Sequence, residues 1–166
     1  MKRVLLDTSV YGELIKDMNL VGVLASLVPN DFVIYGTRII RQELRAISKK
    51  AKLGNESKRK LLLSVYDLFV RKENHDLKVT EIIELVAQNY HAAYKKFGGA
   101  IAYSGILSDF MIVACASVHR LNIVVSHDKA SMLSGSALRA YEAVNRKYQL
   151  ELPEFVMFDK FKEGLI

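Results

Sequence analysis

The chain has 166 residues, 51% of them hydrophobic and 25% charged, which is ordinary for one folded domain and short for two. The first apolar run stops at Asp7 and the uncharged stretch 97–108 is broken by glycines, so we expect no signal peptide, no membrane span and a cytoplasmic protein. A net charge of +6 favours a polyanionic partner, and the single cysteine, Cys115, in an apolar run, excludes a disulfide framework.

The first predicted element is a short buried strand over residues 4–6, where three large apolar residues stand in a row. Asp7 ends this strand, Thr8 and Ser9 follow, and a helix is predicted from Ser9 to about residue 16. In open α/β sheets, ligands bind at the corner between a central strand and the next helix. Asp7 is therefore the first candidate site residue, although helix capping explains it equally well.

Two further helices and a strand are predicted next. Helical spacing over residues 20–28 and a turn signal at Pro29-Asn30-Asp31 lead to a second buried strand at 32–35. Thr37 is expected to cap a helix that runs from residue 38 to about residue 51.

Glu43 occupies an unusual position on this third helix. With Ile40 at 0° and about 100° per residue, Glu43 falls at about 300°, between Ile39 and Ile47. A buried glutamate costs several kcal/mol unless it is paired or bound to a cation. Glu43 is therefore a second candidate, and the alternatives are that it reaches solvent at the edge of the apolar stripe or pairs with a buried arginine.

The stretch 41–60 carries eight basic and two acidic side chains, and residues 52–60 are expected to form a basic loop. Such a stretch either contacts RNA or only keeps a surface solvated. The basic side chains are Arg41, Arg45, Lys49, Lys50, Lys52, Lys58, Arg59 and Lys60.

The second half of the chain repeats the pattern seen at Asp7. A helix over 61–69, a weak strand over 77–79 and a helix over 81–97 come first. Ser108 is then expected to cap a buried helix whose first turn holds Asp109, a position that the helix dipole alone would favour. An apolar strand over 121–125 follows and leads directly into Ser126 and Asp128.

A helix over 136–148 and a strand over 155–158 complete a series of five strands that alternate with helices. This alternation predicts an α/β fold, a three-layer α/β/α sandwich with a mostly parallel sheet, in a single domain over 1–166.

Four carboxylates are expected to meet at the carboxyl edge of this sheet. Asp7 and Asp128 converge if their strands are neighbours, and the helices that carry Glu43 and Asp109 begin at the same edge. Carboxylates gathered in this way repel one another, and Mg²⁺ or Mn²⁺, which prefers oxygen ligands, would relieve the repulsion. The isolated histidines offer no zinc site.

Four segments together resemble the PIN domain family: residues 5–9, Glu43 within 41–44, residues 108–116 and residues 123–128. The resemblance implies a five-strand parallel sheet in the order 3-2-1-4-5 and a magnesium- or manganese-dependent ribonuclease that is often a homodimer. Its acidic positions match Asp7, Glu43, Asp109 and Asp128, and its accessory hydroxyls match Thr8 or Ser9 and Ser126. Many small members are VapC-type toxins, which implies an antitoxin protein as a partner.

Two other functions are compatible with the same residues. One is a non-catalytic RNA- or protein-binding module on the same fold, which retention of all four carboxylates disfavours. The other is a haloacid-dehalogenase-like phosphatase, which requires a second aspartate two residues after Asp7, where this chain has Ser9.

Overall fold

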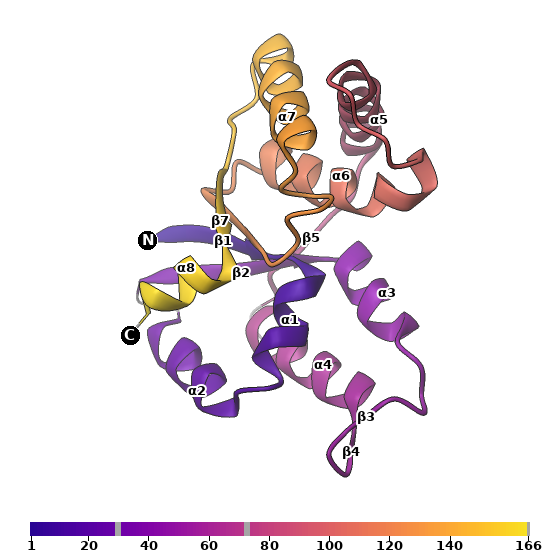
Figure 1. Ribbon diagram of the computed structural model, residues 1–166. Coiled ribbons are helices and arrows are strands. Elements are labelled where there is room, and N and C mark those ends of the chain that lie inside the picture. The colour runs from indigo at the N-terminus through magenta and orange to yellow at the C-terminus, as the bar shows by residue number, and fades with distance from the viewer. Residues whose placement is uncertain (29–30, 72–73, 166) are drawn as a thin grey trace.

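The computed structural model describes residues 1–28, 31–71 and 74–165. A central sheet lies between two layers of helices, with α5, α6 and α7 on one face and α1, α2 and α4 on the other (Figure 1). The expected three-layer α/β/α arrangement is therefore confirmed. The expected turn at Pro29-Asn30 lies outside the described residues.

The sheet has five parallel strands in the order β5-β2-β1-β6-β7. Numbered along the chain, these strands follow the order 3-2-1-4-5, as expected. Their bounds are β1 (Lys2–Leu6), β2 (Phe32–Thr37), β5 (Asp76–Leu77), β6 (Ile123–Ser126) and β7 (Glu154–Met157). In β1, Leu5 aligns with Tyr35 on one side and Val124 on the other and is fully buried, because helices cover both faces of the sheet.

The helices fall close to the expected places. Their bounds are α1 (Thr8–Leu14), α2 (Met18–Leu27), α3 (Arg38–Ala46), α4 (Lys58–Tyr66), α5 (Glu81–Lys96), α6 (Tyr103–Val118), α7 (Gly135–Tyr148) and α8 (Phe158–Glu163), with a π-helical turn at Asp67–Arg71 after α4. Thr37 caps α3 as expected, since its hydroxyl oxygen accepts a hydrogen bond from the backbone N–H of Ile40.

The basic segment after α3 is a hairpin rather than a loop. Helix α3 ends at Ala46, short of residue 51, and the chain forms the antiparallel strands β3 (Lys52–Leu53) and β4 (Glu56–Ser57). Gly54 takes a positive φ of 59° at the turn between them, which glycine adopts without strain. The N–H of Lys58 then bonds to the carbonyl of Ala51 at 2.9 Å and closes the hairpin.

Helix α6 begins at Tyr103, six residues before the expected start at Asp109. Gly105 suggested a break, but a glycine in a first turn costs a helix only about 1 kcal/mol. Asp109 therefore lies in the second turn, and the favourable interaction of a first-turn carboxylate with the helix dipole does not explain it. At the other end of the chain, the strand stops at Met157 and Phe158 opens α8, a helix that the sequence pattern did not predict.

Cys115 is fully buried in α6. In the described part of the chain, no helix is long and apolar enough to cross a membrane.

Candidate metal and catalytic site

Asp7 lies where β1 meets α1, and three donors surround its carboxylate. Oδ1 accepts a hydrogen bond from the N–H of Thr8 at 2.7 Å, and Oδ2 accepts from the hydroxyls of Ser9 at 2.7 Å and Ser126 at 2.9 Å. Ser126 comes within reach because β6 pairs with β1, so that the N–H of Asp7 bonds to the carbonyl of Val125 at 2.9 Å. Asp7 thus both caps α1 and faces the neighbouring strand.

Asp7 is only 4% exposed. Burial raises the pKa of its carboxyl group, and the hydrogen bonds from Ser9, Ser126 and Thr8 oppose this effect without cancelling it. A cation placed beside the carboxylate would favour its charged form.

Glu43 points from α3 toward the start of α1. Its Oε2 accepts a hydrogen bond from the hydroxyl of Thr8. Burial raises the pKa of Glu43, the hydroxyls of Thr8 and Ser108 lower it, and the charge of Asp7 raises it. The side chain therefore faces the site, and its partner is a hydroxyl rather than the buried arginine considered above.

Asp109 and Asp128 meet at Ser131, a residue that the sequence did not identify. The Ser131 hydroxyl lies within hydrogen-bond distance of Oδ2 of Asp109 and, at 2.5 Å, of Oδ2 of Asp128. The N–H groups of Ala130 and Ser131 donate to Oδ1 of Asp128 at 2.8 and 3.0 Å. Burial raises the pKa of Asp128, but these hydrogen bonds outweigh it and hold the pKa below its usual value.

The pKa of the Asp109 carboxyl group is strongly raised. Burial raises its pKa to about 7, the Ser131 hydroxyl opposes this, and the charges of Asp7, Asp128 and Glu43 add to it. A serine hydroxyl has one proton to donate, so its two close carboxylate contacts are best satisfied when one carboxyl carries a proton. The raised pKa of Asp109 and the lowered pKa of Asp128 favour Asp109 as the carboxyl that takes up this proton as the pH falls.

The four carboxylates therefore form one electrostatic cluster at the carboxyl edge of the sheet. Within the described residues, however, no group of three or more His, Cys, Asp or Glu side chains is already gathered around a metal position. Each carboxylate instead turns toward a hydroxyl, of Ser9, Ser126, Thr8 or Ser131. The donor set consists of oxygens with excess negative charge, which fits a hard divalent cation.

A family model of the PIN domain matches residues 4–132, a range that contains all four carboxylates. The chain belongs to the PIN domain family. Members of this family are nucleases, and the acidic cluster of this PIN domain lies at the topological switch point beside β1 and β6.

Solved structures share the fold of this PIN domain. VapBC from Salmonella typhimurium bound to DNA matches with a TM-score of 0.59 and 17% identity, over 95% of this chain and 99% of that chain. VapBC2 from Rickettsia felis bound to a DNA fragment from their promoter matches with a TM-score of 0.56 and 13% identity, over 93% and 96%. FitAcB from Neisseria gonorrhoeae matches with a TM-score of 0.51 and 25% identity, over 81% and 92%. Comparison with curated proteins gave no match.

The acidic cluster of the PIN domain opens to the surface beside Asp128. The open pocket there is lined by Ser9, His127, Asp128, Lys129, Ala130, Met157 and Asp159. Met157 and Asp159 come from the end of β7 and from α8, so the unpredicted helix forms part of the rim. Of the four carboxylates, Asp128 is the one that lines this open pocket.

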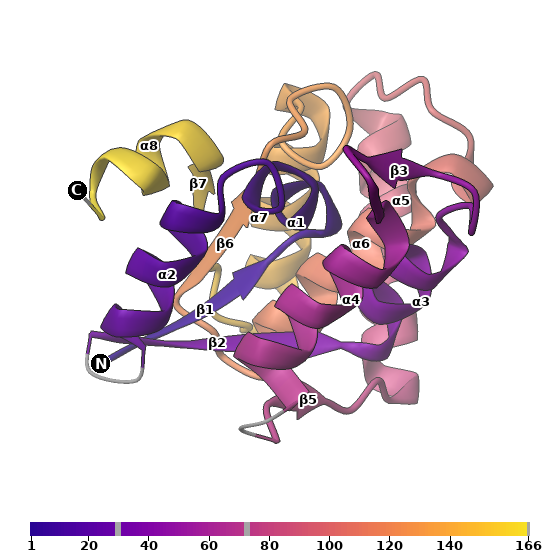
Figure 2. The same ribbon diagram turned by 90° about the horizontal axis from the view of Figure 1, so that it is seen from below.

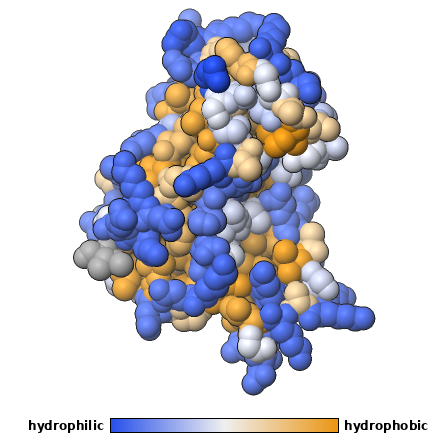
Figure 3. All heavy atoms as spheres, in the orientation of Figure 1, coloured by the Kyte–Doolittle hydropathy of each residue, from blue (hydrophilic) through white to orange (hydrophobic). Residues whose placement is uncertain are grey.

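The basic side chains of the stretch 41–60 surround the β3–β4 hairpin and the ends of α3 and α4 that flank it. Figure 2 shows this hairpin on the same side of the sheet as the start of α1, and in Figure 3 the surface there is largely hydrophilic. Most of these side chains are exposed, while Arg41 pairs with Asp67 at 3.4 Å and Arg59 donates to the carbonyl of Arg45 at 3.3 Å.

Proposed function

We propose that the protein is a metal-dependent endoribonuclease that hydrolyses RNA phosphodiester bonds. The observation that carries this proposal is the convergence of Asp7, Glu43, Asp109 and Asp128 from four separate elements, with Asp109 in the field of the other three. Membership of a nuclease family supports it, as does the net positive charge. The nearby pocket is open, as a polymeric substrate requires.

Asp7, Asp109 and Asp128 would hold Mg²⁺ or Mn²⁺, and Glu43 would bind the ion or orient water. Such an ion, when bound, activates water and stabilises the leaving oxygen of a phosphodiester. Ser9 and Ser126 fix Oδ2 of Asp7 through their hydroxyls, and Thr8 fixes Glu43 in the same way. These hydroxyls keep the carboxylates oriented before the ion arrives.

The regulatory class we propose is that of a VapC-type toxin, a homodimer held inactive by an antitoxin. VapBC and FitAB assemblies are among the structures that share its fold over nearly the whole chain, which supports this class. Co-expression of the product of a short reading frame that overlaps or precedes this one should relieve growth inhibition. Inhibition that persists with every such product would contradict this part of the proposal.

Replacement of one ligand tests the nuclease. Asp7→Asn removes the charge but keeps the shape, so it should abolish cleavage of single-stranded RNA in manganese while the thermal unfolding transition remains cooperative. Gel analysis of RNA fragments measures the loss. Full residual cleavage by a purified, folded variant would defeat the assignment.

A non-catalytic binding module is the second candidate, because each carboxylate is engaged by a hydroxyl and no three surround a metal position in the described chain. Calorimetry with manganese separates the two functions. The nuclease should take up manganese, and Asp109→Asn should weaken the uptake. A binding module should give no heat of manganese binding in either form.

A further inference from the structure

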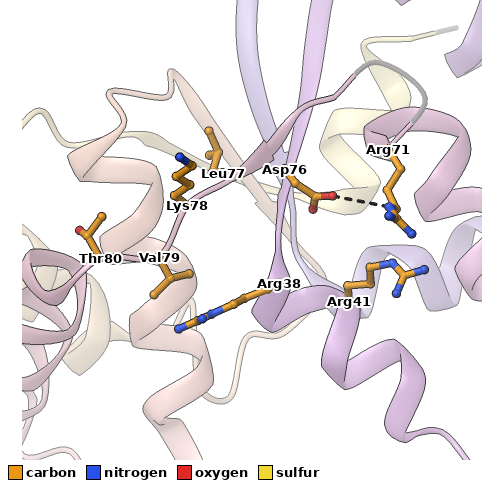
Figure 4. A pocket seen from close by; sticks show the side chains of 8 residues that line it. All are labelled: Arg38, Arg41, Arg71, Asp76, Leu77, Lys78, Val79 and Thr80. Atoms are coloured by element: carbon orange, nitrogen blue, oxygen red, sulfur yellow. Dashed lines mark ion pairs between the residues drawn. The ribbon is translucent and has the colours of Figure 1, made fainter.

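A second pocket lies at the outer strand of the sheet. It is lined by Arg38 and Arg41 of α3, Arg71 at the end of the π-helical turn, and Asp76, Leu77, Lys78, Val79 and Thr80 (Figure 4). Arg41 and Glu43 are two residues apart on one helix and so point to roughly opposite sides of it. This basic pocket is therefore separate from the four carboxylates.

Carboxylates hold two of its arginines in place. Nε of Arg41 lies 3.4 Å from Oδ1 of Asp67, and Nε of Arg71 lies 3.9 Å from Oδ2 of Asp76. The other oxygen of Asp76 accepts a hydrogen bond from the hydroxyl of Tyr66 at 2.5 Å, and Tyr66 is fully buried. Both ion pairs use Nε, which leaves the outer guanidinium nitrogens for a ligand.

The lining of the pocket carries a net positive charge. Its lining has four cations and one carboxylate, and Arg38 and Lys78 are exposed and form no ion pair with any described residue. Glu81 and Glu84 occupy the first turn of α5 nearby, and their charges offset the positive end of its helix dipole. The side-chain cations of the pocket, and not the start of that helix, would therefore attract an anion.

The cations stand apart from one another around the pocket. In Figure 4, Arg41 and Arg71 lie at one end of the pocket, while Arg38 extends away from them toward Val79 and Thr80, on the side where Lys78 lies. A single phosphate would be met by groups that converge on one point. Groups that stand apart suit separate charges, such as the successive phosphates of a polymer.

We propose that the basic pocket binds consecutive phosphates of the RNA strand at a distance from the cleaved bond, an inference that rests on the proposed nuclease function. Arg41 belongs both to this pocket and to the basic stretch 41–60. An acidic protein segment is the competing ligand, since Leu77 and Val79 also line the pocket, and the binding experiment below separates it from RNA.

Binding of labelled RNA without cleavage tests the proposal. Asp7→Asn protein in EDTA is titrated with fluorescein-labelled single-stranded RNA of about 20 or about 5 nucleotides, and the anisotropy is followed at several salt concentrations. Adding Arg38→Gln, Arg71→Gln and Lys78→Gln should weaken binding of the longer RNA at least about tenfold. Because each lost phosphate contact lowers the salt slope by about 0.7 for single strands, the slope should fall by about 2. Binding of the short RNA should change less.

The matched control carries Lys95→Gln, Lys96→Gln and Arg146→Gln, which remove the same charge from exposed positions on α5 and α7. This control should retain the affinity and the salt slope for the longer RNA. Equal losses of RNA affinity in both triple variants would overturn the proposal, because net charge alone would then explain binding. Unchanged RNA binding, with loss of binding to a poly-glutamate peptide, would also overturn it in favour of an acidic protein partner.

Failure of the pocket and failure of the nuclease remain distinguishable. If the protein is not a nuclease, the wild type does not cleave RNA in manganese. If only the proposed RNA binding by the pocket is wrong, the wild type cleaves both long and short RNA. The variant with Arg38, Arg71 and Lys78 replaced then also cleaves both, with an unchanged KM for each.

Discussion

Ser131 joins Asp109 to Asp128 and tunes both carboxyl groups. Its hydroxyl lowers the pKa of each, so removal should raise the pKa of Asp109 further and make protons compete better with the metal. Ser131→Ala should therefore bind manganese several-fold more weakly at about pH 6.5 and nearly normally at about pH 9, measured by calorimetry. Ser64→Ala, at an exposed position on α4, serves as the control. Equal affinity of Ser131→Ala and wild type at both pH values would contradict this role.

The raised pKa values also predict how the metal-free protein responds to pH. Asp7, Glu43 and Asp109 bind protons more tightly in the folded protein than in the unfolded chain. Their contribution to the free energy of unfolding is therefore greatest below about pH 4 to 5, where these groups are protonated in both states. This contribution is lost as the pH rises through about 7. Asp109 alone accounts for up to about 4 kcal/mol of this loss. Asp128 has a lowered pKa, and its contribution is lost only under more acidic conditions.

Urea unfolding in EDTA at about pH 5 and about pH 8 measures this effect. The wild type should be less stable at the higher pH, manganese should restore the difference, and Asp109→Asn should flatten the dependence. A metal-free wild type that is more stable than Asp109→Asn at the higher pH would contradict the proposed repulsion.

The four carboxylates became candidates from the sequence because of where they stand relative to apolar runs, and Asp109 directly precedes one. Asp7 and Asp128 follow buried strands, and Glu43 stands among isoleucines. Ser131 carries no such signal, since a serine three residues after an aspartate is common in loops. Only the folded loop, in which Asp128 accepts the N–H groups of Ala130 and Ser131, brings its hydroxyl to Asp109.

At the scale of elements, strands were easier to predict than helix ends. Apolar runs fixed the strands near Leu5, Ile34 and Val124, because a strand buried on both faces is apolar throughout. The predicted start of α6 was wrong because Ala102 caps it without a side-chain hydrogen bond, so no capping residue marks it. The sequence did not predict the hairpin or α8. Each strand of the hairpin has two residues and α8 has six, and such short elements give no periodic signal.

Gly36 shows how close packing fixes the edge of the sheet. A Cβ at this position would meet the ring and hydroxyl of Tyr66, the residue that also binds the carbonyl of Thr37 and the carboxylate of Asp76. Gly36→Ala should therefore lower the free energy of unfolding by about 1 to 3 kcal/mol. In α1, a Cβ at Gly12 would meet nothing within 4 Å, so Gly12→Ala should raise the free energy of unfolding by up to about 1 kcal/mol. Urea unfolding of both variants checks this, and equal stabilities would contradict the packing.

For the whole molecule, strand order decides where the chemistry lies. Strands β1 and β6 are neighbours in the sheet, although six α-helices and the four strands β2 to β5 separate them along the described chain. Because Leu6 pairs with Val125, the next residues, Asp7 and Ser126, lie side by side and their side chains bond. The alternation of strands and helices predicted a parallel sheet, but the order came from the family resemblance, since periodicity does not reveal which strands pair.

The central claim is that four carboxylates act as one metal site, and rates of RNA cleavage at saturating manganese test it most directly. Asp7→Asn, Glu43→Gln, Asp109→Asn and Asp128→Asn should each lower the rate at least about 100-fold, equivalent to about 2.7 kcal/mol, while exposed Lys95→Gln leaves it unchanged. Pairing Asp7→Asn with Asp109→Asn should lower the rate little further, because groups that act as a unit are not additive. A rate unchanged by any one of the four replacements, or losses that multiply in the double variant, would contradict the claim.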